Sequence, residues 1–175
     1  MFIKYYDISH NKTGIGFLTL HVLKPIQMKK REILELILNK QKQIISNLEQ
    51  TIAHYHLDSN LDEDDTLDPE DYSHQDEASE MKFRLKEILN KAKDDYSFIN
   101  NNLNSVHQSI ENGALIKVED NSYIFVGVSI PPFVANDIKI ITISEKAPIY
   151  KSIKDKTIGE KIAIGNKIYS VISIE

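Results

Sequence analysis

Apolar residues recur at alternating steps of four and three positions along two stretches of the chain, and no other feature restricts the fold as strongly. In the first stretch these positions hold Leu34, Leu38, Gln41, Ile45, Leu48, Ile52 and Tyr55, with Gln41 the one polar member. In the second, with one irregular step after Ala92, they hold Ala78, Met81, Leu85, Ile88, Ala92, Tyr96, Ile99, Leu103, Val106 and Ile110. Such spacing is typical of the seam of a coiled coil. It predicts one helix from about Pro25 to about Leu57 and a second that ends at Gly113, because glycine is favoured just after a helix.

Residues 58–80 separate the two stretches and hold eleven Asp and Glu residues with no Lys or Arg. Pro69 and the density of charge oppose one continuous helix through residues 58–72. We therefore predict an antiparallel coiled-coil hairpin over residues 25–113, with arms about 45 Å long and the acidic segment as its tip. A compact bundle and a dimer formed between two chains are the alternatives. Residues 1–24 are expected to be an N-terminal extension, either a strand or two or the product of an early start codon.

From residue 114 onward the pattern changes to short runs of β-branched residues. The runs ALIKV, SYIFVGVSI and IKIITIS are separated by turn-forming residues, and Gly165 and Asn166 lie between two further apolar runs, as in a β-hairpin. Pro148 suits the first position of a short helix. The predicted fold class is therefore α+β, a helical hairpin followed by a small antiparallel β-sheet domain with one short helix in residues 114–175.

Charge is distributed unevenly along the chain. The net charge is −5, yet outside residues 58–80 there are 21 basic residues and 15 acidic ones. A basic body with an acidic point can be oriented in the electric field of a partner. The chain has no cysteine, which excludes disulfides, thiolate catalysis and cysteine-ligated metals. It also lacks the roughly 20 consecutive apolar residues of a membrane span, so we expect a cytoplasmic protein without a membrane partner.

The C-terminal stretch ISEKAPIYKSIKDKTIGEKIAIGNKIYSVISIE resembles the C-terminal domain of the Gre-type transcript cleavage factors. The matching elements are Pro148 with Ile149, Lys154 to Lys156, Ile158 to Glu160, and Tyr169 to Ile174. Ala147, Asp155 and Glu160 stand where the family usually has Ser, Gly and Asp. The motif covers only this stretch, and the helical hairpin before it extends the likeness to the architecture.

The resemblance implies an FKBP-like C-terminal domain that binds bacterial RNA polymerase, with Pro148, Ile149, Lys154, Lys156 and Gly159 in the binding surface. It implies that the tip enters the secondary channel of the polymerase, where acidic residues help to hold Mg²⁺ and a water for hydrolysis of backtracked RNA. Contact with nascent RNA and DNA would be indirect, through the elongation complex. Such a factor is an elongated monomer that has no active site and no stably bound cofactor of its own, and shares Mg²⁺ with the polymerase.

The residues nearest to the acidic pair of the family are Asp68 with Asp71, or Asp65 with Asp68, and Asp64 and Glu70 lie beside them. Carboxylate oxygens suit Mg²⁺, which in phosphoryl-transfer sites takes one or two carboxylates together with substrate phosphates. This tip is longer and more acidic than that of the family. Its carboxylates repel one another, and a divalent ion would relieve that repulsion. Whether the tip activates, inhibits or only occupies the channel is open at this point.

A second interpretation is a non-catalytic interaction protein. In it the coiled coil is a spacer or a dimerising element, and the acidic segment is a solvated bend. A calcium loop of the EF-hand type is disfavoured because residues 58–80 contain no glycine. A prolyl isomerase is disfavoured because the C-terminal domain has no Trp and no obvious aromatic-lined pocket.

Overall fold

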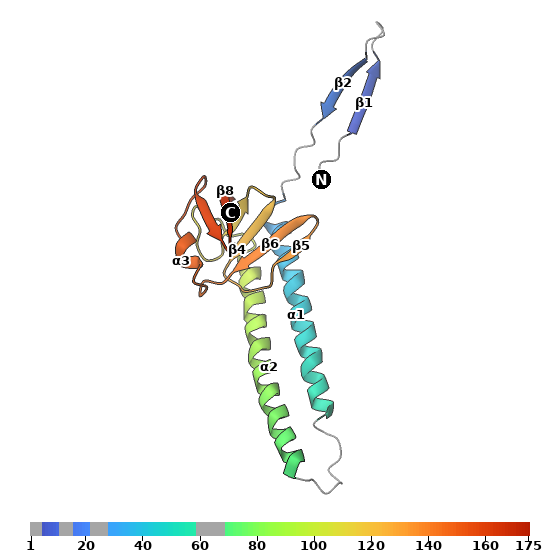
Figure 1. Ribbon diagram of the computed structural model, residues 1–175, viewed down its shortest axis with the longest axis vertical. Coiled ribbons are helices and arrows are strands. Elements are labelled where there is room, and N and C mark those ends of the chain that lie inside the picture. Colours follow the sequence, from blue (N-terminus) through green and yellow to red (C-terminus); the bar gives the residue numbers. More distant parts are fainter. Residues whose placement is uncertain (1–4, 11–15, 22–27, 59–68) are drawn as a thin grey trace.

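The computed structural model describes the backbone of residues 5–10, 16–21, 28–58 and 69–175, and the side chains of residues 28–55, 77 and 79–175. Within these residues the chain is mixed α+β, with two long helices and a six-stranded sheet (Figure 1). The elements are β1 (Tyr5–His10), β2 (Gly16–His21), α1 (Lys30–Asp58), α2 (Pro69–Asn101), β3 (Leu115–Val118), β4 (Ser122–Val126), β5 (Phe133–Ala135), β6 (Ile138–Ile143), α3 (Tyr150–Ile153), β7 (Lys161–Ile164) and β8 (Lys167–Ile174). The N-terminal extension thus contributes two strands, which pair only with each other among the described strands.

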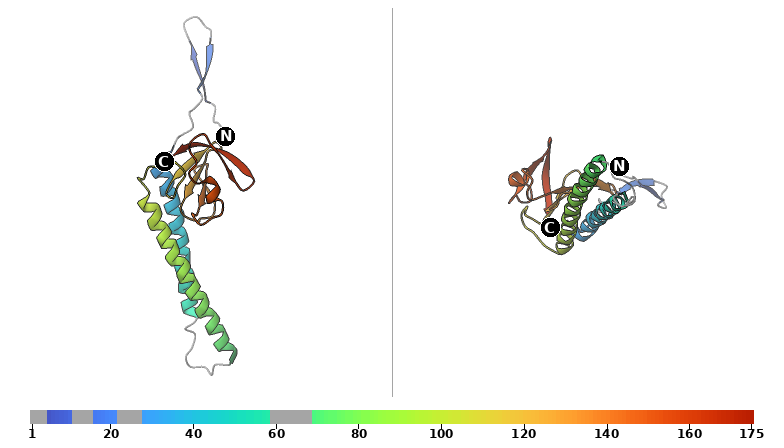
Figure 2. Two further views of the ribbon diagram at one scale, coloured as in Figure 1. Left: turned by 90° about the vertical axis from the view of Figure 1, so that its left-hand side faces the viewer. Right: turned by 90° about the horizontal axis from the view of Figure 1, so that it is seen from below.

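Helices α1 and α2 lie side by side and run in opposite directions (Figures 1 and 2). Several of the predicted seam residues are buried, namely Leu34, Leu38, Gln41 and Ile52 of α1 and Ala92 and Ile99 of α2. Those nearest the sheet also pack against the strands, because Leu34, Leu38 and Ile99 belong to one apolar cluster with Tyr123 and Phe125 of β4. Burial of these side chains holds the helices to each other and to the sheet.

Both helices are shifted from their predicted limits. α1 begins at Lys30 instead of Pro25, and the Glu32 carboxylate accepts a hydrogen bond from the Lys29 N–H at 3.1 Å. α2 ends at Asn101 instead of Gly113. After this point the Asn102 side chain donates to the Phe98 carbonyl at 2.9 Å, so a side-chain amide replaces the backbone N–H that would continue the helix. As a result, the predicted seam residue Val106 is 85% exposed.

The acidic segment is not one continuous bend. Asp58 is the last residue of α1 and Pro69 the first of α2. Pro69 begins the second helix, because proline is well tolerated at the first helical position, where no N–H is needed for a helical hydrogen bond. Residues 69–80 are helical, and residues 59–68 lie outside the described part of the chain.

The six-stranded sheet has the order β5-β6-β4-β3-β8-β7. It is not wholly antiparallel as predicted, because β4 and β6 are parallel, with Ser122 paired to Lys139 and Val126 to Ile143. The cause is β5, which the sequence pattern did not identify. Asn136 and Asp137 both have positive φ, at 50° and 59°, and form the two-residue turn that folds β5 back onto β6. With one reversal before β5 and another after it, β6 runs in the same direction as β4.

The two faces of the sheet have different coverings. Along β4, Tyr123 and Phe125 face the cluster that contains α1, whereas Ile124 and Val126 face the cluster that contains α3. This alternation follows from the two-residue period of a strand. The sheet therefore has apolar residues on both faces, with the long helices on one side and α3 on the other.

Candidate functional site

The acidic segment separates the ends of α1 and α2 that are far from the sheet. The last turn of α1 and the first turn of α2 both point away from the sheet, with α2 extending beyond α1, and the other ends of both helices meet the sheet (Figures 1 and 2). The chain enters and leaves residues 59–68 through the ends of these two helices. The described acidic residues at these helix ends, Asp58, Glu70 and Asp71, are therefore about a helix length away from the C-terminal domain.

The predicted Mg²⁺ ligands divide into two groups. Asp64, Asp65 and Asp68 lie outside the described residues. Glu70 and Asp71 follow Pro69 in the first turn of α2, and only their backbone is described. A helix N-terminus is a favourable place for carboxylates because the helix dipole is positive there. Among the residues whose side chains are described, no group of three His, Asp or Glu residues could hold a metal ion.

The residues that the resemblance places in a binding surface lie around α3 and the loop after it. The helix begins at Tyr150, so Pro148 is in the preceding turn and not at the first helical position as predicted. Pro148, Lys154 and Gly159 are exposed. Ile149 is half-buried against the core beside α3, and the Lys156 ammonium donates to the Lys161 carbonyl. The Ile149 and Lys156 side chains therefore also stabilise the fold of the domain.

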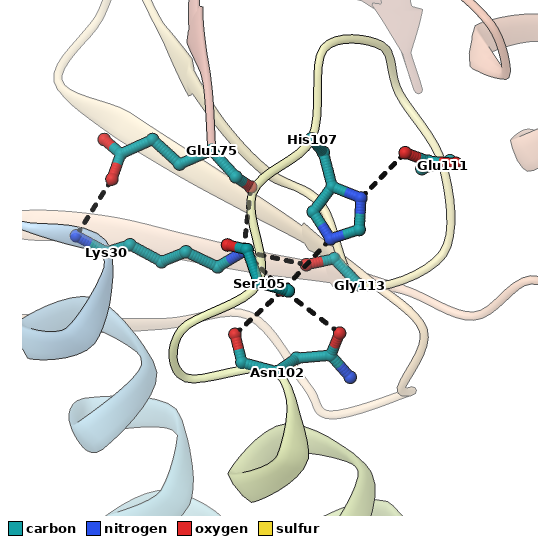
Figure 3. A network of polar contacts seen from close by, with 7 residues as sticks. All are labelled: Lys30, Asn102, Ser105, His107, Glu111, Gly113 and Glu175. Atoms are coloured by element: carbon teal, nitrogen blue, oxygen red, sulfur yellow. Dashed lines mark hydrogen bonds and ion pairs between the residues drawn. The ribbon is translucent and has the colours of Figure 1, made fainter.

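A polar joint connects the helix pair to the sheet, and Lys30 is at its centre (Figure 3). Lys30 is 6% exposed. Its ammonium donates to the Ser105 carbonyl at 2.8 Å, to Ser105 Oγ and the Glu175 carbonyl at 2.9 Å, and to the Gly113 carbonyl at 3.3 Å. The Lys30 backbone N–H donates to the Glu175 carboxylate at 3.3 Å. The start of α1, the loop after α2 and the end of β8 are thus held by one side chain.

Burial affects the proton equilibria near this joint. It lowers the pKa of Lys30 to about 8, while the Glu175 carboxylate acts in the opposite direction. Burial also raises the pKa of Tyr123, with the negative charges of Glu175 and Glu32 adding to the effect. The Tyr123 hydroxyl is buried and has no hydrogen-bond partner.

Ser105, His107 and Glu111 stand in the order of a hydrolase triad. His107 Nε2 is 3.0 Å from Ser105 Oγ, and His107 Nδ1 is 2.8 Å from Glu111 Oε1. Nucleophilic hydrolases use a hydroxyl, an imidazole and a carboxylate in this sequence. A serine nucleophile, however, needs a hydroxyl that gives its proton to the imidazole and an open side from which a substrate can approach.

At Ser105 the hydroxyl already has other partners. Its oxygen accepts a hydrogen bond from the Lys30 ammonium, and its single proton also faces the Asn102 carbonyl at 3.0 Å (Figure 3). The space beside Gly113 is filled by the Asn102 and His107 side chains, which a Cβ at that position would meet. We therefore assign this group to the joint between helices and sheet. The sequence carried no signal for it, because Lys30 stands in an ordinary basic run and its acceptors are mainly backbone carbonyls.

Comparison with protein-family models, with curated proteins and with solved structures finds no match for this chain. In the described residues, no helix has both the length and the apolar character needed to cross a membrane.

Proposed function

We propose that the chain is a Gre-like transcription elongation factor that binds bacterial RNA polymerase through residues 114–175 and inserts an acidic coiled-coil tip into the secondary channel. The observation that carries the proposal is the position of Asp58 and Pro69 at the far end of the helix pair. With 29 and 33 residues, α1 and α2 extend about 44 and 50 Å. Such a reach suits a cavity inside a large partner.

Two turns in the C-terminal domain support the resemblance where the sequence departs from the family. Asp155 has φ 63°, a left-handed conformation that glycine adopts at least cost, which fits a family position usually held by Gly. Glu160, at a position usually held by Asp, accepts hydrogen bonds from the Thr157 N–H at 2.7 Å and hydroxyl at 2.9 Å. Asp155 thus keeps the backbone conformation of the glycine that the family usually has, and Glu160 keeps the carboxylate of the usual aspartate. The FKBP-like identity of this domain is part of the proposal.

In the proposed mechanism the chain lends carboxylates to an enzyme that lacks them. Asp68 and Asp71, with Asp64, Asp65 and Glu70 beside them, would supply oxygen ligands next to the active-site Mg²⁺ of the polymerase. Mg²⁺ held there would activate the attacking water and neutralise the developing phosphate charge. The factor is then a cytoplasmic monomer without its own active site, and the polymerase performs the RNA cleavage.

The test is RNA cleavage by backtracked elongation complexes with wild-type chain or with the triple variant Asp68→Asn, Glu70→Gln, Asp71→Asn. We expect the variant to bind the polymerase and to lose most of the stimulation of cleavage. The control variant Glu119→Gln, Asp120→Asn removes two exposed acids from the turn between β3 and β4, far from the tip. Full stimulation by the triple variant would refute the role of the tip as a metal ligand.

A dimerising scaffold is the second candidate, and one observation favours it. Met81 and Ile88 occupy predicted seam positions on α2, yet both are about half exposed. Two helices alone leave part of each seam open to solvent, and a second helix pair could cover it. Sedimentation velocity separates the candidates, because the proposed factor sediments as an elongated monomer and the scaffold as a dimer.

A further inference from the structure

The N-terminal strands β1 and β2 form a hairpin that stands clear of the six-stranded sheet and of the long helices (Figures 1 and 2). Among the described strands, these two pair only with each other. A two-stranded hairpin alone is at best marginally stable in water, and it becomes stable when it packs against a further surface. The hairpin therefore needs a surface to pack against.

The register of the hairpin gives it one mainly apolar face. Tyr6 is paired with Leu20, and Ile8 with Leu18. Successive residues of a strand alternate between the two faces, and paired residues share a face. These four positions therefore lie on one face, together with the last pair of the hairpin, His10 and Gly16. The opposite face is mixed and holds Tyr5, Asp7, Ser9, Phe17, Thr19 and His21.

A second apolar surface is open on the sheet, at its β7–β8 edge. Tyr169 and Val171 of β8 are buried in the core beside α3. The residues that alternate with them, Ile168 and Ile172, are 73% and 48% exposed. The apolar cluster under α1 includes no described residue of β7 or β8, so the long helices leave this side uncovered. We call Ile168, Ile172 and the exposed Ala163, which pairs with Ile168, the open face.

The chain between the hairpin and α1 is long enough to bring the two surfaces together. The start of α1 lies at the end of β8, because the Lys30 ammonium donates to the Glu175 carbonyl at 2.9 Å. His21 is nine positions before Lys30, and nine residues span at most about 30 Å. Ile168 is seven positions before Glu175, which is about 23 Å along a strand. The hairpin can therefore reach the open face while α1 keeps its place on the sheet.

We propose that the N-terminal hairpin folds back onto the open face of its own chain and covers it with the face of Tyr6, Ile8, Leu18 and Leu20. A second copy is a poorer occupant because the surface is small. Two strands of six residues present about 20 by 10 Å, or about 200 Å². A stable interface between separate proteins buries about 800 Å² on each partner. A tethered segment acts at a local concentration of the order of millimolar, so a small contact is sufficient within one chain.

The hairpin is then a strap that shields the apolar edge of the sheet from solvent and from other proteins. Its contact with the open face consists of apolar side chains on both sides, so a single polar substitution on either side should release it. The same substitution on the mixed face of the hairpin should have no such effect. This difference between the two faces of the hairpin is the basis of the test.

The experiment measures how fast a single introduced thiol in the full-length chain reacts with a soluble aromatic disulfide reagent. The chain has no cysteine, so the reaction has no background. Ala163→Cys places the thiol on the open face. Val134→Cys is the control reporter, because Val134 is 70% exposed on β5 at the other edge of the sheet.

Each reporter is combined with three further substitutions. Ile8→Glu changes the apolar face of the hairpin, and Ile168→Asn changes the open face without adding a charge beside the thiol. Thr19→Glu changes the mixed face of the hairpin and is the matched control for Ile8→Glu. Circular dichroism verifies that each variant is folded.

We expect Ile8→Glu and Ile168→Asn each to raise the reaction rate of Ala163→Cys by at least about fivefold, and Thr19→Glu by less than about twofold. The rate of Val134→Cys should be the same in all backgrounds. An unchanged rate of Ala163→Cys in Ile8→Glu would overturn the strap. Protection that grows with protein concentration would also overturn it, since a second copy would then cover the open face. Either result leaves the proposed function standing, because polymerase binding is not measured.

Discussion

The Gln41 side chain of α1 donates a hydrogen bond of 2.9 Å to the backbone carbonyl of Ala92 in α2. Gln41 is 2% exposed, and its own side-chain oxygen has no hydrogen-bond partner. A polar residue in an apolar seam costs stability but ties two helices together in one register. The position that breaks the seam in the sequence is therefore the position that fixes the alignment of the helix pair.

Replacement of Gln41 should reveal this cost. We expect Gln41→Leu to raise the free energy of unfolding by about 1 kcal/mol, because the unpaired buried oxygen costs more than the single hydrogen bond contributes. Gln43 lies two residues further along α1 and is exposed, so Gln43→Leu should change the free energy of unfolding by less than about 0.5 kcal/mol. Urea denaturation measures both. A destabilised Gln41→Leu chain would mean that the hydrogen bond dominates.

Lys30 should make the stability of the chain depend on alkaline pH. Its pKa is about 8 in the folded chain against 10.5 for an ordinary lysine, so between these values the unfolded chain binds more protons. Stability from this group therefore rises as the pH increases from about 8 to about 10.5, by at most about 3 kcal/mol. Below pH 8 the ammonium is present in both states, and its full burial cost is felt.

The comparison for this prediction is Lys30→Met, since other lysines and tyrosines also titrate at alkaline pH. The difference in unfolding free energy between wild type and variant should grow in favour of wild type between pH 8 and pH 10.5. A difference that stays constant over this range would show that Lys30 keeps an ordinary pKa in the folded chain.

Two glycines with nearly the same backbone conformation should respond differently to alanine. Gly113 has φ +92° and Gly159 has φ +88°. A Cβ at Gly113 would collide with the Asn102 side chain, whereas nothing lies within 4 Å of a Cβ at Gly159. We expect Gly159→Ala to cost about 1 kcal/mol from backbone strain alone, and Gly113→Ala about 3 kcal/mol or more. Equal losses in thermal denaturation would mean that the joint around Asn102 is loosely packed.

The end of α2 can be tested by two positions of the same predicted seam. Ile99 is fully buried near the end of the helix, and Val106 lies beyond the helix and is exposed. Ile99→Ala should cost about 2–4 kcal/mol. Val106→Ala should stay within about 0.5 kcal/mol of wild type. A large loss at Val106 would indicate that the seam continues to Gly113, as the sequence pattern suggested.

The helix pair could be predicted well because burial along a seam repeats over many residues. Leu34, Ile52, Ala92 and Ile99 each occupy a position that the spacing identifies, and each is buried. The end of α2 could not be predicted in this way. There, single hydrogen bonds from the Asn102 and Ser105 side chains end the helix, and such bonds produce no periodic pattern in the sequence.

The sheet was predictable as a set of strands but not in its connections. The three residues of β5 are too few to show alternation, and the parallel pairing of β4 with β6 follows from β5 alone. The exposure of Ile168 escaped prediction for another reason. The alternation along β8 identifies which residues share a face, but only the placement of α1 shows that the face of Ile168 is uncovered.

The joint at Lys30 also has a consequence for the order of events during synthesis. Lys30 and Glu175 bond to each other across 145 positions of the chain. α1 and α2 can pair as soon as residue 101 has left the ribosome, since their mutual contacts need nothing that follows. The apolar contacts of α1 with the sheet need only β3, β4 and β6, whereas the bonds between Lys30 and Glu175 must wait until β8 has been made. The helix pair therefore forms early, and the last strand completes the joint that fixes it to the sheet.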